Sequence, residues 1–317
     1  MNHLESSFTG KNSFWRYLVM FAAVMIATNT IGGFPLILAF ILKSASDPEV
    51  ISELASDPNN LSVLGLDPNL GLIVMLFPFI VGLGTFALLV NPLNGRSLLM
   101  IINGTGTIRW NRFFLSGLVW LILSTGYLFL YLKLDPSNFT LNNTTVTIVI
   151  LILISITFIP FQAAFEEILF RGYLMQGLAV LIRTRWFPLV MTSVLFGLMH
   201  AFNPEVKDFG FFTMMPQYIL FGLIFGAITI LDDGIEAAMG AHTANNIFLC
   251  IMVTHESSAL QTAAVYQQHN VYPWTEFASL LVLGMIFIFI LKIIFKWENF
   301  SPLLSEVVKE KGINHIS

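Results

Sequence analysis

The sequence predicts an all-α fold, a polytopic membrane helical bundle with about eight transmembrane helices. Of the 317 residues, 56% are hydrophobic and only 11% are charged, whereas soluble globular chains carry about 25% charged residues. Apolar windows recur along the chain, and most are near the roughly 20 residues that a helix needs to cross a bilayer. These observations indicate a single helical membrane domain, and no basic patch interleaved with aromatic residues suggests nucleic-acid binding.

The apolar windows can be placed in order along the chain. The first follows a polar stretch that ends at Arg16. It has full span length and lacks a small-residue cleavage site, so we expect it to remain as a helix and not to be removed as a signal peptide. The fourth is much longer than one span requires. The eight windows are Tyr17–Leu42, Leu72–Val90, Phe113–Leu132, Val146–Ile182, Phe187–Phe202, Met215–Leu231, Ile235–Thr254 and Phe277–Phe295.

The basic residues are distributed unevenly between the loops. If eight spans alternate and both termini are cytoplasmic, twelve of the 15 Lys and Arg residues lie in cytoplasmic segments. Basic residues concentrate in cytoplasmic loops of membrane proteins, so this count supports that orientation. The twelve are Lys11, Arg16, Arg96, Arg109, Arg112, Arg171, Arg183, Arg185, Lys292, Lys296, Lys309 and Lys311, and the other three are Lys43, Lys133 and Lys207.

Ionisable residues within the spans divide the chain into three parts. Residues 1–145 hold about three N-terminal spans with essentially no ionisable side chain, and residues 255–317 hold the last span and a short cytoplasmic tail. Residues 146–254, with about four spans, contain the intramembrane ionisable residues. Such residues are costly in lipid and usually functional, so we expect the catalytic core here. They are Glu166, Glu167, Arg171, His200, Glu236 and His242.

Three pairs of residues in this part are spaced four apart, which places each pair on one face of a helix. They are Glu167 with Arg171, Phe196 with His200, and His242 with Asn246. Glu167 and Arg171 should form an ion pair. The neighbouring Glu166 is rotated by about 100° on the helix and is left free.

The depth of these groups in the membrane decides what they can do. Two acids and an arginine at a helix end could simply stop the span at the water boundary. However, the apolar run Val146–Ile182 has 37 residues, so the helix can place Glu166 well inside the membrane, at a depth that His200 can reach. Pro160 and Gly172 are candidate bend points in this run.

One glutamate, two histidines and an asparagine amide form a set suited to water attack on a carbonyl group. A buried carboxylate can take a proton from water while a histidine orients that water. A second histidine and an amide can donate hydrogen bonds to the developing oxyanion. The same ligands leave a zinc site open, although the soluble-protease HExxH pattern is absent. A Glu/His proton relay in a transporter is the alternative from another class.

At these residues the sequence resembles the CPBP family of intramembrane proteases, which includes type II CAAX prenyl endopeptidases and ABI-type bacteriocin-processing or bacteriocin-immunity proteins. The family motifs EExxxR, FxxxH and HxxxN match Glu166–Arg171, Phe196–His200 and His242–Asn246, in family order. The resemblance covers about residues 150–250.

The resemblance implies a role for each motif residue. Glu166 would activate water together with His200, and His242 with Asn246 would form the oxyanion site. Glu167 and Arg171 would be a supporting pair, with Phe196 packed beside His200. The family is described both as metalloproteases and as metal-independent glutamate proteases, so Zn bound by Glu166, His200 and His242 remains open.

The function predicted from the sequence is therefore intramembrane endopeptidase activity in a bacterial plasma membrane. The active site would open toward the cytoplasmic half, and the substrate would be a membrane-associated protein or peptide, CAAX-type or bacterial. The alternatives are the proton-relay transporter and a non-catalytic, bacteriocin-immunity-type protein of the same fold. Glu236 fits either a boundary residue or a supporting acid near His242.

Overall fold

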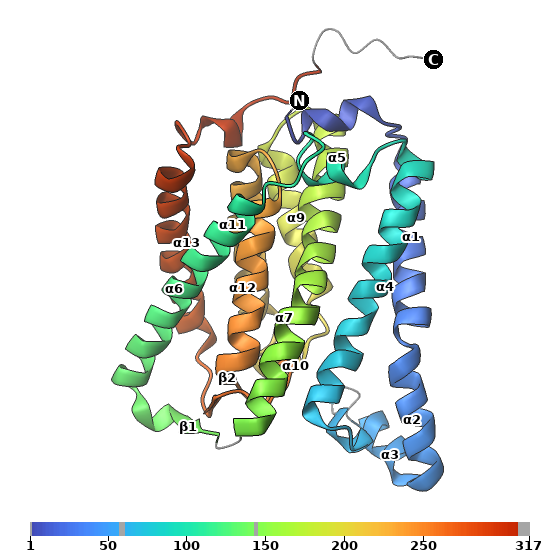
Figure 1. Ribbon diagram of the computed structural model, residues 1–317, viewed down its shortest axis with the longest axis vertical. Helices are drawn as coiled ribbons and strands as arrows, with labels where there is room; N and C mark the ends of the chain where they lie inside the picture. Colours follow the sequence, from blue (N-terminus) through green and yellow to red (C-terminus); the bar gives the residue numbers. More distant parts are fainter. Residues whose placement is uncertain (1, 57–60, 143–144, 310–317) are drawn as a thin grey trace.

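The computed structural model describes residues 2–56, 61–142 and 145–309 and shows a bundle of long helices (Figure 1). The predicted all-α bundle is confirmed. The N-terminal part contains a short 3-10 turn η1 (Glu5–Thr9), followed by α1 (Phe14–Ala27), a π-helical turn η2 (Thr28–Gly32), α2 (Phe34–Ser46), α3 (Glu49–Ser56) and a 3-10 turn η3 (Leu61–Leu64). The helices α4 (Pro68–Asn94), α5 (Leu98–Ile102) and α6 (Trp110–Leu134) complete it.

The second part begins with a 3-10 turn η4 (Pro136–Asn138) and contains the motif residues. Its helices are α7 (Thr145–Glu167), the π-helix η5 (Ile168–Leu174), α8 (Met175–Ile182), α9 (Trp186–Met199), α10 (Pro204–Phe209), α11 (Phe211–Asp232) and α12 (Glu236–Met252). The chain then continues through α13 (Pro273–Phe295) to a last 3-10 turn η6 (Ser301–Leu304).

Every predicted apolar window contains a helix, but the count of eight full-length spans is not confirmed. Six stretches of the described residues are long and apolar enough to cross a membrane, including Phe14–Ser46 with 33 residues and Thr147–Ile182 with 36. The helices of the two remaining windows, α9 and α12, have 14 and 17 residues. These two windows are longer than their helices because the apolar composition continues past the helix ends, into a turn after α9 and into strand β2 (Val253–Thr254) after α12.

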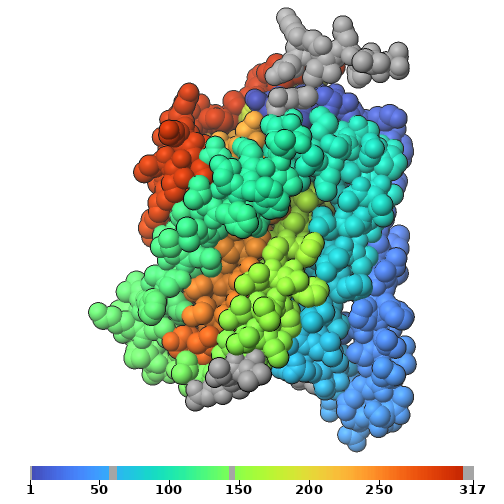
Figure 2. All heavy atoms as spheres, viewed as in Figure 1, coloured from blue at the N-terminus to red at the C-terminus, as the bar shows by residue number. Residues whose placement is uncertain are grey.

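The outer surface and the interior have the polarity expected in lipid. Large apolar side chains face outward, as at Leu88 and Ile293, each 77% exposed, while Glu167 and Arg171 are fully buried. On the face shown in Figure 2, α12 and α7 lie between α6 and α4. The protein is therefore an integral, multi-pass membrane protein whose polar groups lie inside the bundle.

Both ends of the described chain lie at one end of the bundle (Figure 1). The turn η1 is joined to the α8–α9 connection by an ion pair between Glu5 and Arg185, and Glu306 forms a β-bridge with Thr184 in the same connection. This agrees with termini on a common side of the membrane. Lys311, which the sequence places on that side, lies outside the described residues.

Three short strands join loops at the opposite end of the bundle. They are β1 (Phe139–Leu141), β2 (Val253–Thr254) and β3 (Tyr266–Gln268). The central strand β3 pairs antiparallel with β1 and parallel with β2. The loops after α6 and α12 are thereby tied together beneath the helices.

Close packing of α12 against α6 fixes the height of the third motif. Gly117 and Gly240 face each other, and a Cβ on Gly117 would lie 3.0 Å from the Gly240 carbonyl oxygen. The Ser116 hydroxyl donates to the Ala237 carbonyl at 2.6 Å. Small residues let helix backbones approach in membranes, so the glycines and alanines of α12 serve this contact.

Candidate active site

The first motif lies where α7 changes its winding. Glu166 and Glu167 end α7, and the next seven residues form the π-helix η5. Such π-helical turns are rare and often occur at functional sites. Gly172, one of the two predicted bend points, lies within this turn, where a Cβ would meet Ile101. Only glycine lets η5 pack so closely against α5.

Glu167 lies between a cation and a histidine. Its Oε1 accepts from the Arg171 Nη1 at 2.9 Å and from the His242 Nδ1 at 2.8 Å. Arg171 also stacks on Phe196, with 4.2 Å between the guanidinium carbon and the ring centroid. The predicted ion pair is present. The bond from His242 to Glu167 is an additional contact that spacing along one helix cannot reveal.

Glu166 points to the other side of the same imidazole. Its Oε2 lies 3.6 Å from the His242 Nε2 and makes no hydrogen bond with the described residues. Its Oε1 accepts from the Gln162 amide at 2.7 Å. The Glu166 side chain is only 10% exposed. Gln162 thus holds Oε1 of Glu166 in place, while the buried Oε2 faces His242 and accepts no hydrogen bond from the described residues.

The two carboxylates fix the protonation pattern of His242. A carboxylate can only accept, so Nδ1 carries the proton in the bond to Glu167. In the neutral ring, Nε2 is then an acceptor that faces the acceptor Oε2 of Glu166. A proton on one of the two atoms, or a water that donates to both, is required for this approach to be favourable. The His242 ring is also stacked on Phe225, at 5.2 Å between centroids.

His200 ends α9 and is half-buried. Its Nδ1–H donates to the Phe196 carbonyl at 2.8 Å, which leaves Nε2 as the free acceptor. The ring stacks on Tyr218 of α11 at 4.4 Å. Phe196 contacts both histidine rings, at 4.7 Å for His200 and 6.0 Å for His242. His200 also interacts electrostatically with Glu166 and His242, so all three groups share one interior region.

Asn246 reaches this region through an amide network. Its Nδ2 donates to the Gln162 Oε1 at 2.8 Å, and Gln162 in turn donates to Glu166. Asn245 donates to the Asn246 Oδ1 at 3.0 Å and accepts from Trp120 at 3.1 Å. One hydrogen of the Asn246 amide remains available for another acceptor.

Two residues of this site were missed by the sequence analysis. Gln162 precedes Glu166 by four residues, so the same spacing rule that found the other pairs would have found it. Tyr218 has no such signal, because its contact with His200 joins α11 to α9. Both residues hold a motif side chain in its observed position.

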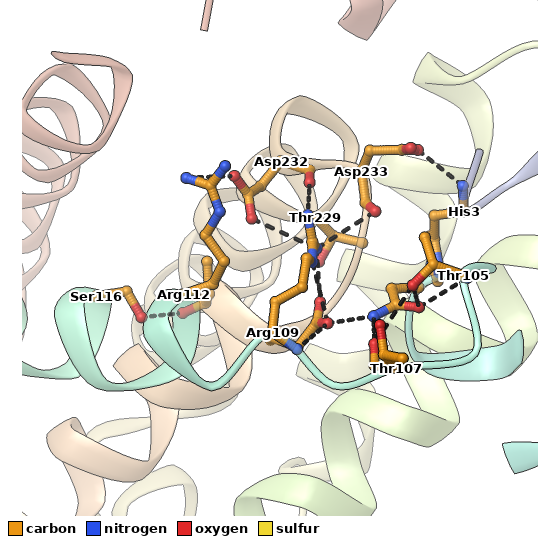
Figure 3. Close-up of polar contacts among 12 residues, drawn as sticks. His3, Thr105, Thr107, Arg109, Arg112, Ser116, Thr229, Asp232 and Asp233 are labelled. Carbon is orange, nitrogen blue, oxygen red and sulfur yellow. Dashed lines mark hydrogen bonds and ion pairs between the residues drawn. The ribbon is translucent and has the colours of Figure 1, made fainter. Parts of the chain in front are cut away.

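Glu236 belongs to a separate ion-pair cluster at the end of the bundle near η1. Its Oε2 lies 2.6 Å from the Arg109 Nη2, and Asn103 donates to its Oε1. Arg109 also donates to the Asp232 carbonyl at 2.7 Å. Figure 3 shows this arginine pointing to the turn at Asp232 and Asp233. Of the two interpretations that the sequence left open, these contacts favour the boundary residue.

The geometry of the residues that the sequence left open for zinc bears on a metal site. Among the described residues, no group of three His, Cys, Asp or Glu side chains could hold a metal ion. His242 Nδ1 and His200 Nδ1 both bond to protein acceptors, an arrangement also found in histidines that bind a metal through Nε2. Zinc bound by Glu166, His200 and His242 therefore stays a prediction from the sequence.

Comparison with known proteins bears on the same residues. Residues 145–248 match the family model of the type II CAAX prenyl endopeptidase Rce1-like proteins. The family resemblance is confirmed for this segment. At the level of the family, the match supports a CAAX-type intramembrane protease. It overlaps the predicted catalytic core, residues 146–254, whose boundaries stay a prediction.

One curated relative matches most of the chain. The uncharacterized protein YyaK of Bacillus subtilis is 26% identical over 259 residues, which cover 81% of this chain and 84% of the relative. No solved structure matches the chain. The relative extends the similarity beyond the motif segment without adding an activity.

Proposed function

We propose that the protein is an intramembrane endopeptidase in which Glu166 activates a water molecule to cleave a peptide bond. The observation that carries the proposal is the approach of Glu166 Oε2 to His242 Nε2, two buried atoms 3.6 Å apart. A water oxygen about 2.8 Å from each atom satisfies ordinary hydrogen-bond geometry. When His242 Nε2 carries a proton, it donates to the oxygen of this water, and the water donates to Glu166 Oε2.

Each step then has a group to carry it. Glu166 takes a proton from the water while the water oxygen bonds to the carbonyl carbon, and the C=O π electrons move to the oxygen. In the next step an electron pair of the oxyanion re-forms the C=O bond, and the C–N bond breaks with its electron pair going to nitrogen. Glu166 gives its proton to that nitrogen, which leaves as an amine. His200, with Nε2 as a free acceptor, is the second base beside this water.

His242 and Asn246 would stabilise the oxyanion. His242 Nδ1–H is already bonded to Glu167, so a second proton on Nε2 makes the ring a cation with a donor directed into the site. The Glu167 carboxylate stabilises that cation. The remaining hydrogen of the Asn246 amide is a further donor.

The substrate is proposed to be a membrane-associated protein or peptide tail, with both termini of the enzyme in the cytoplasm. The family match names CAAX prenyl endopeptidases, so a prenylated CAAX peptide is the first probe. The same peptide without its lipid tests whether the prenyl group is required. A bacterial membrane-protein tail is the other substrate that the sequence predicts.

The test is Glu166→Gln, which keeps the shape of the side chain and removes its basicity. Purified protein in liposomes would be incubated with the prenylated peptide, and membranes from cells with and without the variant would be compared for uncut tails. We expect cleavage to fall by at least about 100-fold. The exposed Glu256→Gln is the matched control. Cleavage at the wild-type rate by a folded Glu166→Gln variant would show that the proposal is wrong.

A further inference from the structure

A short N-terminal segment is buried in the end of the bundle next to the site. Within this segment, here called the N-terminal plug, the six residues 3–8 are all buried. Leu4 and Phe8 pack in an apolar cluster with Met175 and Ala179 of α8, Ile230 of α11 and the C-terminal Val307. The plug is therefore seated between helices that carry or support the motif residues.

His3 makes the polar contacts at the deep end of the plug. Its backbone N–H donates to the Asp233 Oδ1 at 2.7 Å (Figure 3), and its ring Nε2 lies 3.1 Å from the Arg171 carbonyl oxygen. A carbonyl only accepts, so Nε2 carries the proton. Burial lowers the pKa of His3, which agrees with a neutral ring.

Gln176 of α8 fixes the same ring from the other side. Its amide nitrogen donates to the His3 carbonyl at 2.8 Å and lies 3.3 Å from the His3 Nδ1. Its Oε1 accepts from the Arg96 Nη1 at 2.7 Å. His3, Gln176 and Arg96 are each 1% exposed or less. The tautomer with Nε2–H is thus the one that satisfies both partners of the His3 ring.

The plug and the site meet at one residue. The Arg171 carbonyl accepts from His3, and the Arg171 guanidinium donates to Glu167, which accepts from His242. Arg171 lies in the π-helix η5, whose winding differs from that of the flanking α-helices. The hydrogen bond from His3 holds the backbone of Arg171. It therefore helps to fix the position of the Arg171 side chain and of the Glu167 carboxylate that this side chain contacts.

We infer that His3 is a positioning residue for the proposed hydrolysis and acts through the Arg171 carbonyl on the Glu167–His242 bond. This inference rests on the proposed function. The competing explanation is that the plug only fills space and adds stability. The two differ in whether the loss of one hydrogen bond changes the catalytic step.

Three variants separate these explanations. His3→Leu keeps apolar volume and removes the donor to Arg171, and His3→Gln offers an amide donor in its place. Ser7→Ala is the control in the same plug, because the buried Ser7 hydroxyl bonds only locally, to the Leu4 carbonyl at 2.5 Å. Thermal unfolding of each full-length variant in detergent reports any loss of stability.

Cleavage of the prenylated CAAX peptide provides the first measurement. We expect His3→Leu to lower kcat at least about tenfold with little change in KM, because a small misplacement of catalytic groups reduces the rate and not the binding. His3→Gln should restore most of the rate, and Ser7→Ala should retain it. An unchanged kcat in His3→Leu, or equal losses in His3→Leu and Ser7→Ala, would overturn the inference.

The second measurement does not depend on substrate. The chain has 6 histidines, so labelling histidine with ¹⁵N and recording the imidazole signals allows His242 to be assigned by substitution. We expect the Nδ1 signal of His242 to shift in His3→Leu and to stay in place in Ser7→Ala. If wild-type protein cleaves no probe and this shift is seen, the proposed function fails while the structural link stands. If Glu166→Gln is inactive and the shift is absent, the inference alone fails.

Discussion

The pair Glu167–Arg171 predicts that stability and activity can be separated in this protein. Both side chains are fully buried, and Glu167 is the ion-pair partner of Arg171. Glu167→Gln keeps an oxygen that can accept hydrogen bonds but removes the negative charge. The guanidinium then loses its ion-pair partner inside the bundle and keeps the electrostatic attraction of Glu166.

The expected magnitude follows from this burial. Removing one partner of a buried ion pair costs about 3–5 kcal/mol of unfolding free energy, whereas replacing both partners with apolar groups is often neutral or stabilising. The Phe196 ring lies 4.2 Å from the Arg171 guanidinium carbon. It contacts the cation in wild type and in Glu167→Gln alike, so it does not alter the difference in unfolding free energy between these two proteins. We therefore expect Glu167→Gln to lose about 3–5 kcal/mol and the double variant Glu167→Leu/Arg171→Met, which replaces both partners with apolar groups, to return to within about 2 kcal/mol of wild type.

Activity should not return with stability. The Glu167 carboxylate also holds His242 and stabilises its cationic form, so cleavage by the double variant should stay at least about 100-fold below wild type. Denaturant unfolding in detergent micelles measures the first quantity, and cleavage of the prenylated peptide measures the second. Recovery of cleavage in the double variant would refute a role for Glu167 in catalysis, and wild-type stability of Glu167→Gln would refute the charge balance.

Two further predictions concern residues outside the motifs. Gln162→Leu removes the donor to Glu166 and leaves that carboxylate free to rotate, so kcat should fall by about tenfold or more with KM nearly unchanged, as steady-state kinetics on the peptide will show. Gln162→Glu, which also lacks the amide donor, is the second variant. An unchanged kcat in both variants would show that the Gln162 amide does not position Glu166 for catalysis. Burial lowers the pKa of His255 from 6.5 to about 4, with Asp208 opposing it. The folded state binds fewer protons than the unfolded state between these values, so stability is full above pH 6.5 and falls as the pH drops toward 4. The slope is at most about 1.4 kcal/mol per pH unit, and His255→Gln should flatten it in unfolding measurements at several pH values. Equal slopes in the two proteins would contradict this expectation.

The sequence predicted contacts along one helix more fully than contacts between helices. Spacing of four residues correctly predicted the Glu167–Arg171 ion pair, because the helix period alone brings these side chains together. It could not predict that Glu167 also bonds His242, since that contact depends on how α12 packs against α7. Tyr218 and His3 were missed for the same reason.

The count of eight full-length spans is not confirmed, for a related reason. An apolar window reports composition, whereas the end of a helix depends on local hydrogen bonding. Past Met199 the chain leaves the helix at His200, although Ala201 and Phe202 are still apolar. In α12 the polar residues His242, Asn245 and Asn246 interrupt the apolar pattern, because these side chains bond within the bundle.

The short length of α9 has a consequence for the lipid around it. Its 14 residues rise about 21 Å, while the hydrocarbon layer of a bilayer is about 30 Å thick. A helix of this length that starts at one membrane surface ends inside the hydrocarbon layer, unless the bilayer thins beside it or headgroups and solvent move inward beyond its end. His200 stands at that end, so the lipid boundary itself would bring water closer to the place where hydrolysis needs it.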